Sequence, residues 1–106
     1  MTTSEPSGPV FDALADPTRR EVLRRLAREG PASATGLASS LPVSRQAVAK
    51  HLAALEGAGL VEGHRRGRER LYRLRPAPLT EATAWMSDVA TRWDQRLEAL
   101  RRLVEE

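Results

Sequence analysis

The sequence predicts a mainly α-helical protein with one small β-hairpin, arranged as a winged helix-turn-helix with a long C-terminal dimerisation helix. Three observations predict this fold. A short helix, a tight turn and a second helix follow one another over residues 33–58, and a basic hairpin follows over residues 60–74. An apolar stripe with helical spacing then extends over residues 79–106. The 106 residues suit one domain with a modest core of its own.

The N-terminal part is expected to be a tail followed by two helices. Residues 1–9 are rich in Ser, Thr, Gly and Pro, so we expect a disordered tail, and residues 10–106 form the single domain. Asp16 is a good N-cap for a second helix, in which Pro17 takes the favoured first position and Gly30 ends the helix. The short first helix that precedes it has an apolar face made of Val10, Phe11 and Leu14.

The two motif helices are predicted from their capping residues. Ser33 precedes a helix of about two turns that stops before Pro42, because the residue before a proline disfavours helix. Ser44 then caps a helix that begins at Arg45, with Val43 and Val48 at the two positions of a hydrophobic staple. Gly59 suits a left-handed C-terminal cap, so the second helix should end near Ala58.

One face of this second helix is unusually small. At about 100° per residue, the side opposite the apolar stripe of Val48, Leu52 and Leu55 carries Gln46, Lys50, Ala53 and Gly57, flanked by alanines. Two hydrogen-bonding side chains on an otherwise small face can enter a major groove. The alternative, an alanine-rich surface helix, is left open by this helix alone.

The hairpin is strongly basic. Strand-like runs at residues 60–61 and 71–74 are separated by residues 64–70, in which Gly67 can take a positive φ. Guanidinium groups so presented suit phosphates and a narrow minor groove, and next to a groove-shaped helix this interpretation is favoured over a solvated charge run. The arginines are Arg65, Arg66, Arg68, Arg70 and Arg73.

The C-terminal helix has more apolar surface than one small domain can cover. Its stripe repeats with alternating spacings of four and three residues through Met86, Ala90, Trp93, Leu97, Leu100 and Val104, widened by Trp85, Val89 and Leu103. We therefore expect dimerisation through Trp85, Met86, Val89, Trp93, Leu97 and Leu100. The alternative is a helix folded back wholly onto its own domain.

Several segments in the same order carry a family resemblance. They are Asp16-Pro17-Thr18-Arg19, Ser44-Arg45-Gln46-Ala47-Val48-Ala49-Lys50-His51-Leu52, the run from Leu55 through Ala58-Gly59-Leu60-Val61, and Gly67-Arg68 with Tyr72-Arg73-Leu74. From about Phe11 to Leu103 the chain resembles the ArsR-type (arsenic-repressor-like) bacterial transcriptional regulators. The resemblance implies a dimeric winged-helix repressor that reads operator DNA with the helix beginning at Arg45 and dimerises through its terminal helices. The residues expected to contact DNA are Ser44, Arg45, Gln46, Ala49, Lys50, Arg65, Arg66 and Arg68.

Metal sensing and catalysis find no support in the residues. Many members of this family bind metals through cysteines in the first motif helix or through His and carboxylates in the last helix. Here the chain has no Cys, residues 79–106 contain no His, and the two histidines lack a partner at a diagnostic spacing. We expect no metal, no cofactor and no enzyme activity. His51 should be packed and hydrogen-bonded, and His64 should open the wing, close to phosphate.

Charge and polarity fit a nucleic-acid partner. The net charge is +3, and residues 1–78 hold 13 basic against 8 acidic side chains, or +5, whereas residues 79–106 hold 4 against 6, or −2. The positive charge therefore belongs to the winged-helix part. The polar start of the chain lacks the apolar run of a signal peptide, and no stretch is long enough to span a membrane, so we expect a cytoplasmic protein without membrane contact.

The sequence thus favours a sequence-specific DNA-binding repressor of its own or a neighbouring operon, not metal-sensing. Its inducer is either absent or an apolar small molecule lodged near Trp85 and Trp93. One alternative is a ligand-responsive or metal-responsive sensor of the same fold. The other is a winged helix that serves only as a protein-interaction module.

Overall fold

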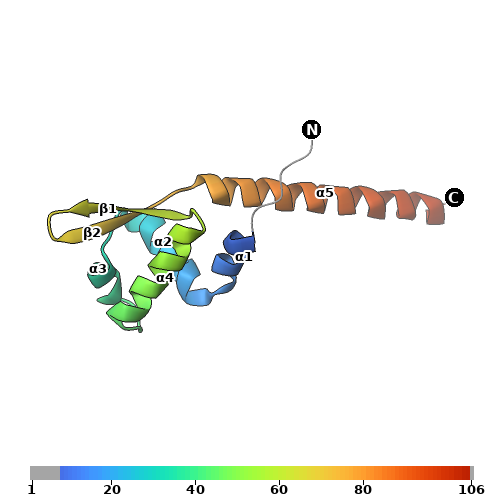
Figure 1. Cartoon of the computed structure of the whole chain (residues 1–106). Coiled ribbons are helices and arrows are strands. Elements are labelled where there is room, and N and C mark those ends of the chain that lie inside the picture. Colours follow the sequence, from blue (N-terminus) through green and yellow to red (C-terminus); the bar gives the residue numbers. More distant parts are fainter. Residues whose placement is uncertain (1–7, 106) are drawn as a thin grey trace.

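The computed structural model describes residues 8–105, and it is mainly α-helical with one two-stranded hairpin, as the sequence predicts. Figure 1 shows a body made of the first four helices and the hairpin, from which the last helix projects. No helix in this part of the chain is both long and apolar enough to cross a membrane. The elements are α1 (Gly8–Ala15), α2 (Pro17–Glu29), α3 (Ala34–Ala38), α4 (Arg45–Gly57), β1 (Val61–Arg66), β2 (Glu69–Leu74) and α5 (Ala77–Glu105).

The predicted helix caps are confirmed. The Asp16 carboxylate accepts hydrogen bonds from the backbone N–H groups of Thr18 and Arg19 at 2.8 and 3.1 Å, and Pro17 takes the first helical position of α2. The Ser44 hydroxyl accepts from the Ala47 N–H at 3.1 Å, at the start of α4. These caps satisfy N–H groups that have no partner inside the helix, and they fix where α2 and α4 begin.

Three helix boundaries differ from the expectation. Gly8 and Pro9 belong to α1 instead of the tail, whose remaining residues 1–7 lie outside the described residues, as does Glu106. The helix α5 begins at Ala77, two residues early, because a proline is tolerated in a first turn. The helix α3 is shorter than two turns, since the Ser39 hydroxyl donates to the Gly36 carbonyl at 2.7 Å and competes with the helical pattern.

A single core fixes the orientation of α4. Its apolar side packs with α2, α3 and the start of β1, and the fully buried larger side chains are Val22, Val48, Leu52, Leu55, Leu60 and Val61. Burial of three α4 side chains leaves only the opposite side of this helix free for a partner. That side is the small face predicted from the sequence.

The wing has longer strands than the sequence suggested. The antiparallel register runs from Val61 opposite Leu74 to Arg66 opposite Glu69, so residues 64–66 and 69–70 lie in strands instead of a loop. Only Gly67 and Arg68 form the turn, and Gly67 has φ +64° while no other residue type among residues 8–105 has a positive φ. This pattern is typical of a type II′ turn, whose twist allows the strands to pair up to the tip.

The helix α5 runs far beyond the body. The structure measures 69 × 29 × 22 Å, and Ala82 is the one buried residue of α5 within the described range. Trp85 packs on its own α1, with its ring centroid 5.6 Å from that of Phe11 in an edge arrangement. The alternative of a helix folded wholly back onto its own domain is therefore wrong.

Candidate nucleic-acid interface

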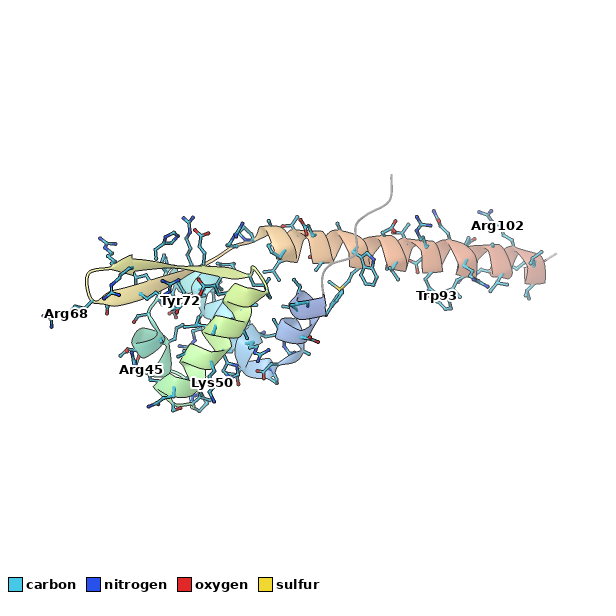
Figure 2. All side chains as sticks on the ribbon, in the orientation of Figure 1. Arg45, Lys50, Arg68, Tyr72, Trp93 and Arg102 are labelled. Carbon is cyan, nitrogen blue, oxygen red and sulfur yellow. The ribbon has the colours of Figure 1, made fainter. Side chains whose placement is uncertain are left out.

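The outward face of α4 is exposed. Gln46 and Lys50 lie one turn apart on this helix, and both are solvent-exposed, as are Ser44, Arg45 and Ala49. Figure 2 shows Arg45 and Lys50 projecting from α4 on the outside of the body. A hydrogen-bonding side chain at each of two successive turns can read neighbouring base edges from a major groove.

A groove of about 210 Å³ separates α4 from the wing. It brings together Arg45 and Ala49 of α4 and Arg68 of the wing turn, three of the residues that the sequence singled out. Its lining also includes Ser33, Ala34, Thr35, Glu69, Arg70 and Tyr72. Polar and basic walls on both sides suit a phosphate backbone.

Thr35 was missed by sequence reasoning. The Arg45 Nε atom donates to the Thr35 hydroxyl oxygen at 2.8 Å, so α3 orients an arginine of α4. The signal was present in the exposed hydroxyl of the first motif helix, but the contact spans ten residues across the turn. Only the crossing of the two helices brings Thr35 and Arg45 together.

The wing arginines fall into two groups. Within the part of the chain that the structure describes, no ion pair involves Arg65, Arg66 or Arg68, and all three are exposed. Arg70 pairs instead with Glu56 at 3.1 Å, and Arg73 donates from Nε to Glu62 at 2.7 Å. Arg65, Arg66 and Arg68 are therefore available to phosphates. Arg70 and Arg73 instead form ion pairs that stabilise the hairpin.

The register also separates Arg65 from Arg66. Arg65 stands opposite Arg70, on the sheet face that carries Tyr72, whereas Arg66 lies on the other face with His64. Arg68, at the turn, is the outermost residue that Figure 2 labels on the wing. The three arginines surround the tip instead of sharing one face.

Three basic side chains, those of His64, Arg73 and Arg75, surround the Glu62 carboxylate at the base of the wing. Its Oε1 atom lies 2.7 Å from the Nε2 atom of His64, and Arg75 approaches its other oxygen at 3.8 Å. The hydrogen bond with His64, followed by that with Arg73, lowers the pKa of the Glu62 carboxyl below its ordinary value. His64 thus lies inside β1 against a carboxylate, which corrects its expected place at the opening of the wing.

His51 has the packed, hydrogen-bonded environment that the sequence predicted. It is partly buried on α4, and its Nδ1 atom accepts from the Nε of Arg19 at 3.2 Å. An accepting Nδ1 requires the tautomer that carries its proton on Nε2. Over residues 8–105 there is no group of three or more His, Cys, Asp or Glu side chains arranged to hold a metal ion.

The predicted dimerisation stripe is largely uncovered. Trp93 is 60% exposed and Leu100 is 52% exposed, which is unusual for large apolar side chains. Figure 2 shows Trp93 on one side of α5 and Arg102 on the other, in the half that projects from the body. The remaining exposed members of this face are Met86, Val89, Leu97, Leu103 and Val104.

Comparison with known proteins points to one family. A family model described as a helix-turn-helix domain matches residues 14–64. The HTH-type transcriptional regulator Rv2034 of Mycobacterium tuberculosis is 38% identical over 105 residues, which cover 99% of this chain and 94% of that protein. The transcriptional repressor SdpR of Bacillus subtilis is 32% identical over 88 residues, covering 83% and 97% of the two chains.

A solved structure agrees over almost the whole chain. The ArsR-like transcriptional regulator from Rhodococcus sp. RHA1 superposes with a TM-score of 0.85 at 46% sequence identity. The match covers 92% of this chain and 88% of that one, so it includes the wing and much of α5. The chain belongs to the ArsR-type family of winged helix-turn-helix proteins and is a DNA-binding transcriptional regulator.

Proposed function

We propose that the protein is a dimeric, cytoplasmic repressor that binds operator DNA in front of its own or a neighbouring operon. In each subunit, α4 enters a major groove and the wing follows the adjacent backbone. The observation that carries the proposal is the groove between α4 and the wing, which Arg45 and Arg68 both line and in which, over residues 8–105, neither forms an ion pair. The mechanism involves no cofactor and no catalytic step.

The roles within each subunit follow from geometry. Gln46 and Lys50 project from the small face of α4, where an amide can bond adenine and an ammonium can bond guanine. Arg65, Arg66 and Arg68 surround the wing tip, from which guanidinium groups reach phosphates or a narrow minor groove. Base contacts from α4 would supply specificity, and the wing would supply affinity.

Dimerisation supports this proposal through the exposed face of α5. The 29 residues of this helix extend about 43 Å, longer than the body needs, and their apolar stripe lacks cover in one subunit. A two-fold interface would bury the same stripe of both chains and hold two copies of α4 at a fixed separation. An operator would then be a pair of inverted half-sites.

Direct metal induction is not part of the proposal. The sequence has no cysteine, and its two histidines lie on different elements, with Arg19 and Glu62 as their partners. Zinc, cadmium or arsenite at stoichiometric concentration should therefore leave the protein on its DNA, as measured by anisotropy of labelled duplex. Tight binding of one metal ion per subunit in calorimetry, with release of DNA, would show a metal-responsive sensor instead.

The test is a binding titration on the DNA upstream of the protein's own gene. Fluorescence anisotropy should show tighter binding to this duplex than to a scrambled duplex of equal length and composition. Binding to neither duplex would favour the protein-interaction module, because the exposed arginines would then have no nucleic-acid partner.

An inducer is either absent or an apolar small molecule that binds near Trp85 and Trp93.

A further inference from the structure

One carboxylate connects α4 to the wing. Glu56 lies in the last turn of α4, and its Oε2 atom accepts hydrogen bonds from the Gly63 N–H at 3.0 Å and from Arg70 Nη2 at 3.1 Å. Gly63 belongs to β1 and Arg70 to β2. A single side chain therefore joins the helix to both strands of the hairpin.

Backbone pairing explains why the Gly63 N–H is available. Gly63 stands opposite Tyr72, whose own N–H and C=O bond to Ala32 on the outer edge of β2, at 2.9 and 3.1 Å. The Gly63–Tyr72 pair is consequently one in which the two strands do not exchange hydrogen bonds. The Gly63 N–H points away from β2, to the side where Glu56 accepts it.

The absence of a side chain at Gly63 also makes room for Arg70. A Cβ atom at this position would lie 2.9 Å from Arg70 Cζ and 3.0 Å from its Nη2, closer than ordinary contacts allow. Arg70 passes over Gly63 with its Cζ atom 5.7 Å from the centre of the Tyr72 ring, within the range of a cation–π contact. We call Glu56, Gly63, Arg70 and Tyr72 the Glu56 clamp.

The clamp lies next to the groove. Arg70 and Tyr72 line the same groove as Arg45 and Arg68, and the hydrogen bonds of Glu56 join the end of α4 to both strands beside this groove. A two-stranded hairpin has little stability alone and depends on what it packs against. The wing is thus held at both edges, by Ala32 on β2 and by Glu56 on β1.

We propose that Glu56 is a positioning residue for DNA binding, which fixes the wing relative to α4 so that both contact one duplex together. This inference rests on the proposed function, in which the wing and α4 both bind DNA. Glu56 itself contacts no DNA in this arrangement. Its effect is transmitted through Gly63 and Arg70.

The change in DNA affinity on removing Glu56 has opposite expected signs for a pure charge effect and for loss of the clamp. Removing a carboxylate from a DNA-binding surface should, by charge alone, strengthen binding to a polyanion. The clamp predicts the reverse: Glu56→Ala should weaken operator binding about tenfold, because the wing loses its fixed orientation. Glu69→Ala is the matched control, since Glu69 lines the same groove, lies outside the clamp and carries the same charge. This control should bind at least as tightly as the wild type.

A second variant keeps every charge. Gly63→Ala displaces Arg70 and should weaken operator binding about as much as Glu56→Ala does. The double variant Glu56→Ala/Gly63→Ala should bind the operator little more weakly than either single variant.

A third comparison uses Arg68. Arg68→Ala should reduce operator affinity less in the Glu56→Ala background than in the wild type, because a released wing no longer presents Arg68. General damage to the fold would not produce this coupling. Thermal unfolding and sedimentation of each variant accompany the titrations.

The outcomes separate the clamp from the proposed function. If Arg68→Ala weakens the wild type but Glu56→Ala binds as tightly as Glu69→Ala, the wing contacts DNA and the clamp proposal is overturned. If Arg68→Ala leaves wild-type binding unchanged, the wing contact of the proposed function fails, and the clamp proposal fails with it. Should Glu56→Ala not fold, Gly63→Ala decides by the same comparison.

Discussion

Arg68 and Arg70 are two positions apart in the wing, and their surroundings differ. Arg68 is at the exposed turn, whereas Arg70 is held by Glu56 and Tyr72. The hydrogen bond that Arg70 donates to the Glu56 carboxylate raises the pKa of Arg70 above its ordinary value, so its charge is fixed and already compensated. The two arginines are therefore not equally available to a partner, although both belong to one basic run in the sequence.

At the same scale, Asp16 gives a prediction about pH. The Asp16 carboxylate accepts hydrogen bonds from the backbone N–H groups of Arg19 and Thr18. These bonds, of which the one from Arg19 has the larger effect, lower the pKa of Asp16 below the ordinary value of 3.8. Because the pKa of Asp16 is lower in the folded state than in the unfolded state, Asp16 contributes fully to stability when the pH is above its unfolded-state pKa. This contribution is lost as the pH falls through its folded-state pKa. Asn caps a helix without titrating, so Asp16→Asn should lose less stability than the wild type on acidification.

Thermal unfolding midpoints from about pH 6 to about pH 3 check this expectation. Glu21 and Glu62 also have lowered pKa values, from hydrogen bonds with Arg24 and His64 respectively, so both proteins should lose stability in acid. The difference between the wild-type and Asp16→Asn curves of unfolding midpoint against pH therefore measures the effect of Asp16. Parallel curves would show that the cap does not titrate in this range.

Residue-level prediction succeeded where the partner is close in the chain. Asp16 and Ser44 cap the N–H groups two or three residues ahead, which a local pattern can identify. The partners of Arg70 and Arg73 lie 14 and 11 positions away, and only the hairpin register and the end of α4 bring them together. Local sequence therefore identified the basic hairpin, with Arg65, Arg66 and Arg68 as its expected DNA contacts, but it did not identify Glu56 and Glu62 as the partners of Arg70 and Arg73.

At the scale of elements, α4 and the wing both carry exposed basic side chains. Arg45, Lys50, Arg65, Arg66 and Arg68 in two subunits could neutralise on the order of 6 to 10 phosphates, so affinity should fall about 10³-fold or more between about 50 and 200 mM salt. Arg68→Ala should lower the slope of log affinity against log salt by about one per subunit. Titrations at several salt concentrations measure both quantities. A flat salt response would contradict a phosphate-binding groove.

The elements also show why strand length was harder to predict than helix length. Helices α2 and α4 begin and end at caps that the sequence marks clearly, whereas β1 and β2 contain mostly charged residues near the tip. Charged residues have low strand propensity, so residues 64–70 suggested a loop. The type II′ turn at Gly67 overrides that preference, because it brings the two strands into register up to Arg66 and Glu69.

At the scale of the whole molecule, α5 connects DNA binding to assembly. Trp93 lies in the middle of the exposed apolar stripe, so Trp93→Asp would place an unpaired charge in the proposed interface and shift the protein toward monomer. Operator affinity should fall with it, since two linked copies of α4 bind better than one. Sedimentation at micromolar protein concentration and operator titration measure the two effects.

Gln95→Asp is the matched control for this change. It makes the same change in charge two residues further along α5, about 200° around the helix, where the side chain is exposed. This variant should remain dimeric and bind the operator as the wild type does. A wild-type protein that is already monomeric at micromolar concentration would contradict the proposed α5 interface.

The central claim is that α4 reads sequence and the wing does not. Gln46→Ala should cost about 1 to 3 kcal/mol on the operator and little on a scrambled duplex, because it removes a contact to a base edge. Arg68→Ala should weaken binding to both duplexes alike, because phosphates carry no sequence. The decisive measurement is therefore the pair of titrations of Gln46→Ala on operator and scrambled DNA. A loss confined to the operator is the predicted result, and an equal loss on both duplexes would contradict the assignment of sequence reading to α4.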